Sequence, residues 1–200
     1  MRLSSILALA GLSMLATGLS LWLLSPRLDL LLFERIRLDA GNDGVAPFQF
    51  FTAIGGFAVL GPLALLIAAC LIARRHHALA LWLFAVIGSG RLMIEAMKAL
   101  VARPRPPLAD RLTEVSTHSF PSSHAAGTLL TWLAIAMLFP ALRRRLLPFA
   151  LIMAAGIGWS RIALGVHWPS DVLAGYGLAL LWVGVAARWL PAPPEAVSRA

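Results

Sequence analysis

Three short polar segments carry residue types suited to anion binding and acid–base chemistry, and each borders a long apolar run. They are Lys98 through Arg105-Pro106, then Pro121-Ser122-Ser123-His124, and finally Ser160-Arg161 through His167 to Asp171. Charge beside a membrane segment is costly and usually marks a functional position. We therefore expect the three segments to meet in a single site that handles phosphate.

The basic residues and serines of these segments are expected to bind the phosphate. Removing phosphate from a lipid requires fixed donors for the negative charge of the phosphoryl group. Arginine offers a planar fork to phosphate oxygens, lysine offers a point charge, and the first N–H groups of a helix form an anion site. The expected phosphate-binding residues are Lys98, Arg105, Ser122, Ser123 and Arg161.

The histidines are expected to carry the bond-making and proton-transfer steps. Asp171 follows His167 by four residues, at the expected start of a helix. An aspartate bonded to one imidazole nitrogen fixes the tautomer and leaves the other nitrogen free to attack. This spacing predicts His167 as a covalent nucleophile oriented by Asp171. His124 is then the general acid for the departing lipid oxygen and the base for water.

The elements that position these residues are apolar helices. The chain has 200 residues, of which 60% are hydrophobic and 13% charged, whereas a soluble domain has about 25% charged residues. This composition predicts an all-α, polytopic membrane protein. Six segments are long enough to cross a hydrocarbon core of about 30 Å. They are residues 4–24, 57–73, 80–100, 122–139, 146–160 and 172–190.

The longest expected loop covers residues 25–55, before the second span. Residues 28–37 are mixed in polarity and predict a helix lying on the membrane surface. This helix either guides lipid into the site or serves as an ordinary connector. We accordingly expect residues 1–54 to hold the first span and this external loop. Residues 55–190 form a catalytic core of five spans, and residues 191–200 a polar cytoplasmic tail.

The distribution of charge predicts the orientation. With the N-terminus inside, the cytoplasmic turns hold Arg74, Arg75 and Arg143 to Arg145, while the opposite loops hold Asp29, Glu34, Asp39, Asp43, Asp110 and Glu114. This is the positive-inside pattern, and it places all three polar segments outside. The net charge of +8 is spread over span ends rather than gathered in a patch, which argues against a nucleic-acid partner. We expect a bacterial inner-membrane protein whose site faces the periplasm.

The third span is unusual because it carries charge within its apolar sequence. Arg91, Glu95 and Lys98 fall at i, i+4 and i+7, on one helical face. Arg91 and Glu95 can pair, and this pair is either purely structural or supports the site. The single cysteine, Cys70, lies in an apolar run and can form no intramolecular disulfide.

The three segments together resemble the type 2 phosphatidic acid phosphatase family, whose motifs are K-x6-R-P, P-S-G-H and S-R-x5-H-x3-D. The first motif matches Lys98 through Arg105-Pro106, and the third matches Ser160-Arg161 through His167 and Asp171. The second departs from the pattern, with Ser123 in place of glycine, so phosphate could approach the backbone less closely there. The resemblance covers about residues 55–190.

The resemblance implies an integral membrane lipid phosphatase that uses no metal and no cofactor. It implies the roles given above for His167, Asp171 and His124, and a supporting role for Ser160. Phosphatidic acid, phosphatidylglycerol phosphate and undecaprenyl diphosphate are all possible substrates, because they present the same head-group chemistry. Asp171 is the only carboxylate within reach of the segments by spacing, which argues against a Mg²⁺ or Zn²⁺ site.

Two other function classes compete with this interpretation. Vanadium-dependent haloperoxidases resemble the same family, but they are soluble, and six spans argue against them. A lipid or anion transporter needs basic residues but has no need for the His167–Asp171 spacing or for His124. Release of phosphate in detergent distinguishes an enzyme from a transporter. The sequence carries no signal of oligomeric state.

Overall fold

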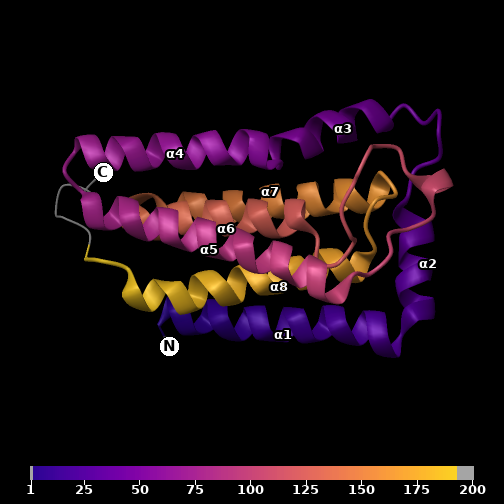
Figure 1. Cartoon of the computed structure of the whole chain (residues 1–200), viewed down its shortest axis with the longest axis horizontal. Helices are drawn as coiled ribbons and strands as arrows, with labels where there is room; N and C mark the ends of the chain where they lie inside the picture. The colour runs from indigo at the N-terminus through magenta and orange to yellow at the C-terminus, as the bar shows by residue number, and fades with distance from the viewer. Residues whose placement is uncertain (1, 193–200) are drawn as a thin grey trace.

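The fold, obtained as a computed structural model that describes residues 2–192, is a bundle of long helices (Figure 1). Its α-helices are α1 (Leu3–Leu24), α2 (Pro26–Ile36), α3 (Val45–Ile54), α4 (Phe57–Ala73), α5 (His77–Val101), α6 (Ser123–Leu138), α7 (Arg143–Ala163) and α8 (Pro169–Ala186). Short 3-10 turns occur at Leu108–Asp110, Pro140–Leu142 and Ala187–Trp189. Residues 2–192 contain no strand, which confirms the all-α class. The expected tail of residues 191–200 lies outside the described residues from position 193 onward.

Five stretches of helix are long and apolar enough to cross a membrane, where six spans were expected. They are Leu3–Leu24, Val45–Ala73, His77–Val101, Pro140–Ala163 and Pro169–Trp189. The remaining apolar helix, α6, has 16 residues, fewer than the roughly 20 that a full crossing needs. Nearly all of α6 is buried by its neighbours, so its surroundings are protein rather than lipid.

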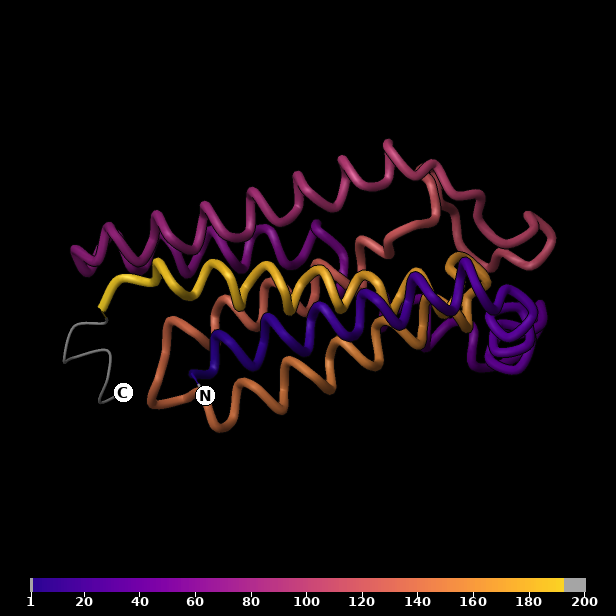
Figure 2. The backbone as a smooth tube through the Cα atoms, turned by 90° about the horizontal axis from the view of Figure 1, so that it is seen from below, coloured from indigo at the N-terminus to yellow at the C-terminus, as the bar shows by residue number. Residues whose placement is uncertain are grey.

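Helix α6 occupies the middle of the bundle, and α4, α5, α7 and α8 pack around it. It contacts α7 and α8 most extensively and also touches α4 and α5. Helix α1 lies alongside α8 over its length in both views (Figures 1 and 2). A Cβ atom on Gly177 would lie 2.4 Å from the backbone nitrogen of Leu15. This position of α8 therefore requires glycine, because the two backbones touch there.

The segment expected as a loop, residues 25–55, contains two helices. Helix α2 matches the expected short helix and lies across one end of the bundle (Figure 1). It is anchored to the protein, because Asp29 and Phe33 are buried. The loop expectation was wrong for α3, which is apolar and continues toward α4 after a break at Gly55-Gly56. An apolar sequence next to a span adopts helix because its backbone polar groups then bond to one another.

The two ends of the bundle differ in charge, as the sequence predicts. The α4–α5 and α6–α7 connections lie at the end opposite α2 (Figures 1 and 2). These connections hold or adjoin Arg74, Arg75 and Arg143 to Arg145. The loop between α5 and α6 lies at the α2 end, together with the start of α8. The three polar segments are therefore assembled at one end of the molecule.

Candidate active site

A pocket of about 370 Å³ opens where the polar segments meet. Its wall includes Arg105 from the α5–α6 loop, Ser123 and His124 from the start of α6, Arg161 near the end of α7, and His167 from the α7–α8 turn. Helix α3 adds Thr52 and Gln49, which the sequence analysis did not assign to the site. Residues from all three motifs thus face a single cavity.

The turn between α7 and α8 places His167 against the pocket. Gly165 in this turn has a φ of +71°, and a Cβ atom there would lie 1.9 Å from the carbonyl oxygen of Asp110. Only glycine suits both the left-handed conformation and this close approach. Helix α8 then begins at Pro169, so that Asp171 lies in its first turn. His167 Nδ1 lies 3.3 Å from Asp171 Oδ2, the contact that the four-residue spacing predicts.

The Asp171 carboxylate is held by donors on several sides. The Ser119 hydroxyl donates to Oδ2 at 2.5 Å, the Trp168 backbone N–H donates to Oδ2 at 3.0 Å, and Arg103 Nη1 donates to Oδ1 at 2.5 Å. A carboxylate that accepts these bonds is fixed in orientation. His167 Nδ1 then carries the ring proton and donates a hydrogen bond to Asp171. This tautomer, assigned from the hydrogen bonds, leaves Nε2 with a free electron pair.

Arg105 lies beside the free nitrogen of His167. Its Nη1 is 3.1 Å from His167 Nε2 and donates to the carbonyl oxygen of Val166 at 2.5 Å. Its Nε donates to the carbonyl oxygen of Thr117 at 2.6 Å. Burial lowers the pKa of Arg105 to about 10, against the opposing effect of Asp171. The guanidinium therefore remains charged at neutral pH and is positioned to bind an anion in contact with His167.

Arg161 offers a second guanidinium to the pocket. Its Nη1 donates to the Thr52 hydroxyl at 3.1 Å. Its Nε is buried and has no hydrogen-bond partner within the part of the chain that the structure describes. An unpaired buried donor of this kind is costly unless a ligand satisfies it. A phosphate oxygen in the pocket would supply that acceptor.

Lys98 and Ser122 are placed differently from the sequence-based expectation. Lys98 is buried, and its ammonium group donates to the carbonyl oxygens of His118 at 2.7 Å and Ser119 at 3.5 Å. The Ser122 backbone N–H, expected as a phosphate donor, instead donates to the carbonyl oxygen of Asp171 at 3.0 Å. Both residues tie the α5–α6 loop and the start of α6 to neighbouring backbone, and neither lines the pocket.

The start of α6 brings Ser123 and His124 to the pocket, next to a glutamate of α5. The Ser123 hydroxyl donates to Glu95 Oε1 at 3.1 Å. The expected ion pair between Glu95 and Arg91 is absent among the described side chains. Arg91 instead places its guanidinium carbon 4.4 Å from the centre of the Phe57 ring. Helical spacing permitted the pair, but a ring from α4 lies beside the arginine.

A buried ion network behind the site was missed by the sequence analysis. Arg103 donates from Nη2 to Asp29 Oδ2 at 2.9 Å and from Nη1 to the Ser170 hydroxyl at 2.7 Å, in addition to its bond with Asp171. Asp29 also accepts from the backbone N–H of Ser170 at 3.0 Å and from its hydroxyl. The network links α2 to the first turn of α8. An acidic residue within the leucine-rich stretch of residues 28–33 was the available sequence signal.

Comparison with known proteins identifies similar sequences and a similar structure. A family model described as PAP2 superfamily matches residues 79–194. The chain is 33% identical over 137 residues to phosphatidylglycerophosphatase B of Bacillus subtilis, covering 65% of this chain and 67% of that protein. It is 39% identical over 123 residues to decaprenylphosphoryl-5-phosphoribose phosphatase of Mycobacterium tuberculosis, covering 58% of this chain and 63% of that protein.

The structural comparison extends over almost the whole chain. The crystal structure of a transmembrane PAP2-type phosphatidylglycerolphosphate phosphatase from Bacillus subtilis superposes with a TM-score of 0.77 at 27% sequence identity. The superposition covers 93% of this chain and 94% of that one. The similarity therefore includes α1 to α4, all of which lie before the residues that the family model matches.

Proposed function

The chain belongs to the PAP2 superfamily, and from this premise we propose that it is a multi-pass membrane lipid phosphatase. The observation that carries the proposal is the position of His167, which contacts Asp171 through one ring nitrogen and Arg105 through the other. A nucleophile held by a carboxylate and facing a cationic pocket is suited to attack on phosphorus.

In the first chemical step, His167 takes the phosphoryl group from the lipid. The electron pair on Nε2 forms a bond to phosphorus while the bond from phosphorus to the lipid oxygen breaks. Asp171 stabilises the positive charge that develops on the ring by accepting a hydrogen bond from the Nδ1–H group. Arg105 and Arg161 bind the phosphoryl oxygens, and His124 gives a proton to the departing lipid oxygen.

In the second step, water releases the phosphate. His124, now neutral, accepts a proton from water as the water oxygen bonds to phosphorus. The bond between phosphorus and Nε2 breaks, and its electron pair returns to His167. The products are the dephosphorylated lipid and inorganic phosphate, and the site is restored to its starting protonation state.

The reaction is proposed to need no metal ion or cofactor. Across residues 2–192 there is no group of three or more His, Cys, Asp and Glu side chains placed to hold an ion. Apart from Glu114, the polar side chains that line the pocket are cationic or neutral, which suits a phosphate anion and opposes a cation.

Phosphate release by the purified protein in detergent tests both the function and metal independence. We expect release from phosphatidic acid, phosphatidylglycerol phosphate or undecaprenyl diphosphate to continue at the same rate in excess EDTA. Loss of release in EDTA, restored by added Mg²⁺, would contradict metal independence. Lipid transport across vesicles without phosphate release from any of the three lipids would contradict the phosphatase itself.

The pH dependence is expected to report on His167. Burial lowers the pKa of His167 well below its usual 6.5, and the charges of Arg105, Arg161 and Lys98 lower it further. A lowered pKa keeps the imidazole neutral, and therefore nucleophilic, to lower pH. The pH dependence of kcat/KM reports the ionisations of the free enzyme. We expect kcat/KM to fall to half its maximum on the acidic side only below pH 6.5. An acidic half-point at or above pH 6.5 would show that His167 is not perturbed in this way.

The orientation and division of the chain follow the charge distribution. We propose a bacterial inner-membrane protein whose pocket faces the periplasm, with residues 55–190 as catalytic core and residues 1–54 completing it. Asp29 and Thr52, from the first part, support Arg103 and Arg161 of the core. Fused after residue 200, a reporter that is active in the cytoplasm is expected to be active, and a reporter that is active in the periplasm is expected to be inactive. Activity of a periplasmic reporter at that position would reverse the orientation.

A further inference from the structure

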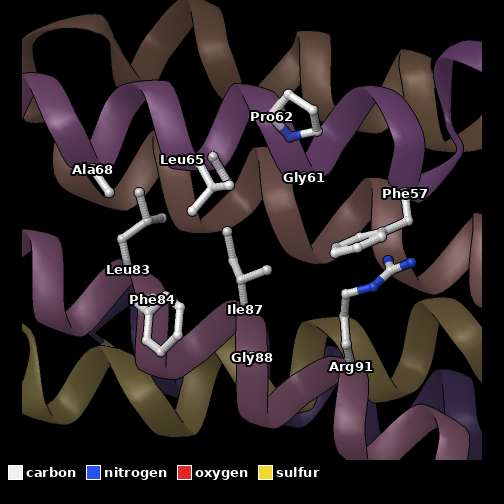
Figure 3. A pocket seen from close by; sticks show the side chains of 11 residues that line it. Phe57, Gly61, Pro62, Leu65, Ala68, Leu83, Phe84, Ile87, Gly88 and Arg91 are labelled. Carbon is white, nitrogen blue, oxygen red and sulfur yellow. The ribbon is translucent and has the colours of Figure 1, made fainter.

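A second cavity, of about 480 Å³, lies between α4 and α5 and is almost wholly apolar. Figure 3 shows its walls, with Leu65 and Ala68 on α4 facing Leu83, Phe84 and Ile87 on α5. Both helices belong to stretches apolar enough to cross a membrane. We call this cavity the α4–α5 groove. Its chemistry suits a hydrocarbon chain.

One end of the α4–α5 groove is charged. The guanidinium of Arg91 lies over the face of Phe57, as Figure 3 shows. It makes no hydrogen bond or ion pair with any side chain of residues 2–192. A charged group within a membrane span is costly, and such groups usually pair with an opposite charge. Glu95, one turn along α5, attracts Arg91 from beyond ion-pair distance, so within residues 2–192 no carboxylate contacts the guanidinium and an anion can bind there.

The charged end of the α4–α5 groove adjoins the active-site pocket. A Cβ atom on Gly56, the residue before Phe57, would lie 3.5 Å from His124 Nε2. A Cβ atom on Gly127, one turn after His124, would lie 2.3 Å from Arg91 Nη1. His124 also lines the catalytic pocket. His124 therefore lies near both the phosphate site and the start of α4, and Arg91 contacts the next turn of the helix that carries His124.

We propose that Arg91 and the α4–α5 groove form a subsite for the leaving half of a lipid diphosphate, with a hydrocarbon chain in the groove. Resting on the phosphatase function proposed above, this names the substrate class. The terminal phosphoryl group occupies the pocket of Arg105 and Arg161 and transfers to His167. The bond from phosphorus to the bridging oxygen breaks, and its electrons stay with the lipid monophosphate. Arg91 binds that inner phosphate, whose charge grows as the bond breaks, and the groove holds the chain.

The test of Arg91 compares two probes that differ by one phosphate. Farnesyl diphosphate and farnesyl monophosphate carry the same chain, and only the first places an anion beside Arg91. We expect Arg91→Gln to lower kcat/KM for the diphosphate by about 10- to 100-fold, the effect of losing a charged hydrogen bond. The loss for the monophosphate should be about threefold or less. Arg91→Lys should recover part of the diphosphate activity, because it restores the charge without the planar fork.

The test of the groove uses a position where a larger side chain fits without strain. Gly88 lines the groove, and a Cβ atom there would have no atom within 4 Å. Gly88→Leu should fill the groove and raise KM for farnesyl diphosphate by about 10-fold, through lost burial of the chain. The rise for dimethylallyl diphosphate, which has a much shorter chain, should be several times smaller. The matched control is Leu92→Phe, an exposed position of α5 outside the groove, which should leave both substrates unaffected.

The outcomes separate this inference from the phosphatase function. Equal losses on farnesyl diphosphate and farnesyl monophosphate in Arg91→Gln would overturn the role of Arg91, while the enzyme would remain a phosphatase. An equal rise in KM for long and short chains in Gly88→Leu would overturn the role of the groove. Release of phosphate from the monophosphate by the variants shows that they are folded. Failure of the native protein to release phosphate from either probe or from the glycerolipid phosphates would reject the function itself.

Discussion

Replacing His167 with alanine is expected to lower phosphate release by about 10⁴-fold or more, since it removes the atom that bonds to phosphorus. His167 is 1% exposed, with Nδ1 toward Asp171 and Nε2 toward Arg105. Alanine leaves these partners in place but supplies no nucleophile. The measurement is single-turnover release from a radiolabelled lipid phosphate in detergent. The protein should also be isolated in alkali, where phosphohistidine is stable, so that radiolabelled phosphate bound to it can be measured.

The matched control is His77→Ala, at an exposed position at the opposite end of the bundle. We expect His77→Ala to retain native rates and native phosphate labelling of the protein. His167→Ala should show no labelling, although the lipid still binds. If His167→Ala kept a rate within about 10-fold of native, His167 would not be the nucleophile. Labelling of His167→Ala at another residue would assign the nucleophile there.

Replacing Arg103 with glutamine is expected to destabilise the fold and to slow the reaction. The substitution leaves the buried carboxylates of Asp29 and Asp171 without their shared positive charge. Breaking a buried pair in this way costs about 3–5 kcal/mol. Asp171, which keeps its bonds from Ser119 and the Trp168 backbone N–H but loses that from Arg103, also orients His167 less strictly, and a misplacement of about 1 Å lowers a rate by about 10²-fold. The free energy of unfolding in detergent measures the loss of stability, and kcat measures the slower reaction.

Arg37 provides the control, because it also binds carboxylates but does so at the surface. Its Nε lies 2.7 Å from Glu34 and its Nη1 3.0 Å from Asp39, whose side chain is 87% exposed. Arg37→Gln should cost about 1 kcal/mol or less, because water screens such pairs. Adding Asp29→Asn to Arg103→Gln should recover stability by removing one uncompensated charge. If the double variant were less stable than Arg103→Gln, the ion network would not account for the loss.

The sequence by itself determined the helical class, the membrane character and the local part of the site. Apolar runs of span length predict helices because a backbone in lipid must bond to itself. The contact between His167 and Asp171 follows from a four-residue spacing at the start of a helix. The short helix after α1 was also expected, within two residues of its start at Pro26. Each of these features depends on neighbours in the sequence.

Only the tertiary structure decided which distant groups complete the site. It joined Arg103 to Asp29 across 74 residues and Arg161 to Thr52 across 109. In it, Lys98 donates to a backbone carbonyl oxygen, and Arg91 lies over Phe57 instead of pairing with Glu95 as its spacing allowed. Hydropathy and periodicity say which face of a helix is apolar, but the rotation and depth at which helices pack depend on side-chain fit between them. That fit placed Arg91 at one end of the α4–α5 groove.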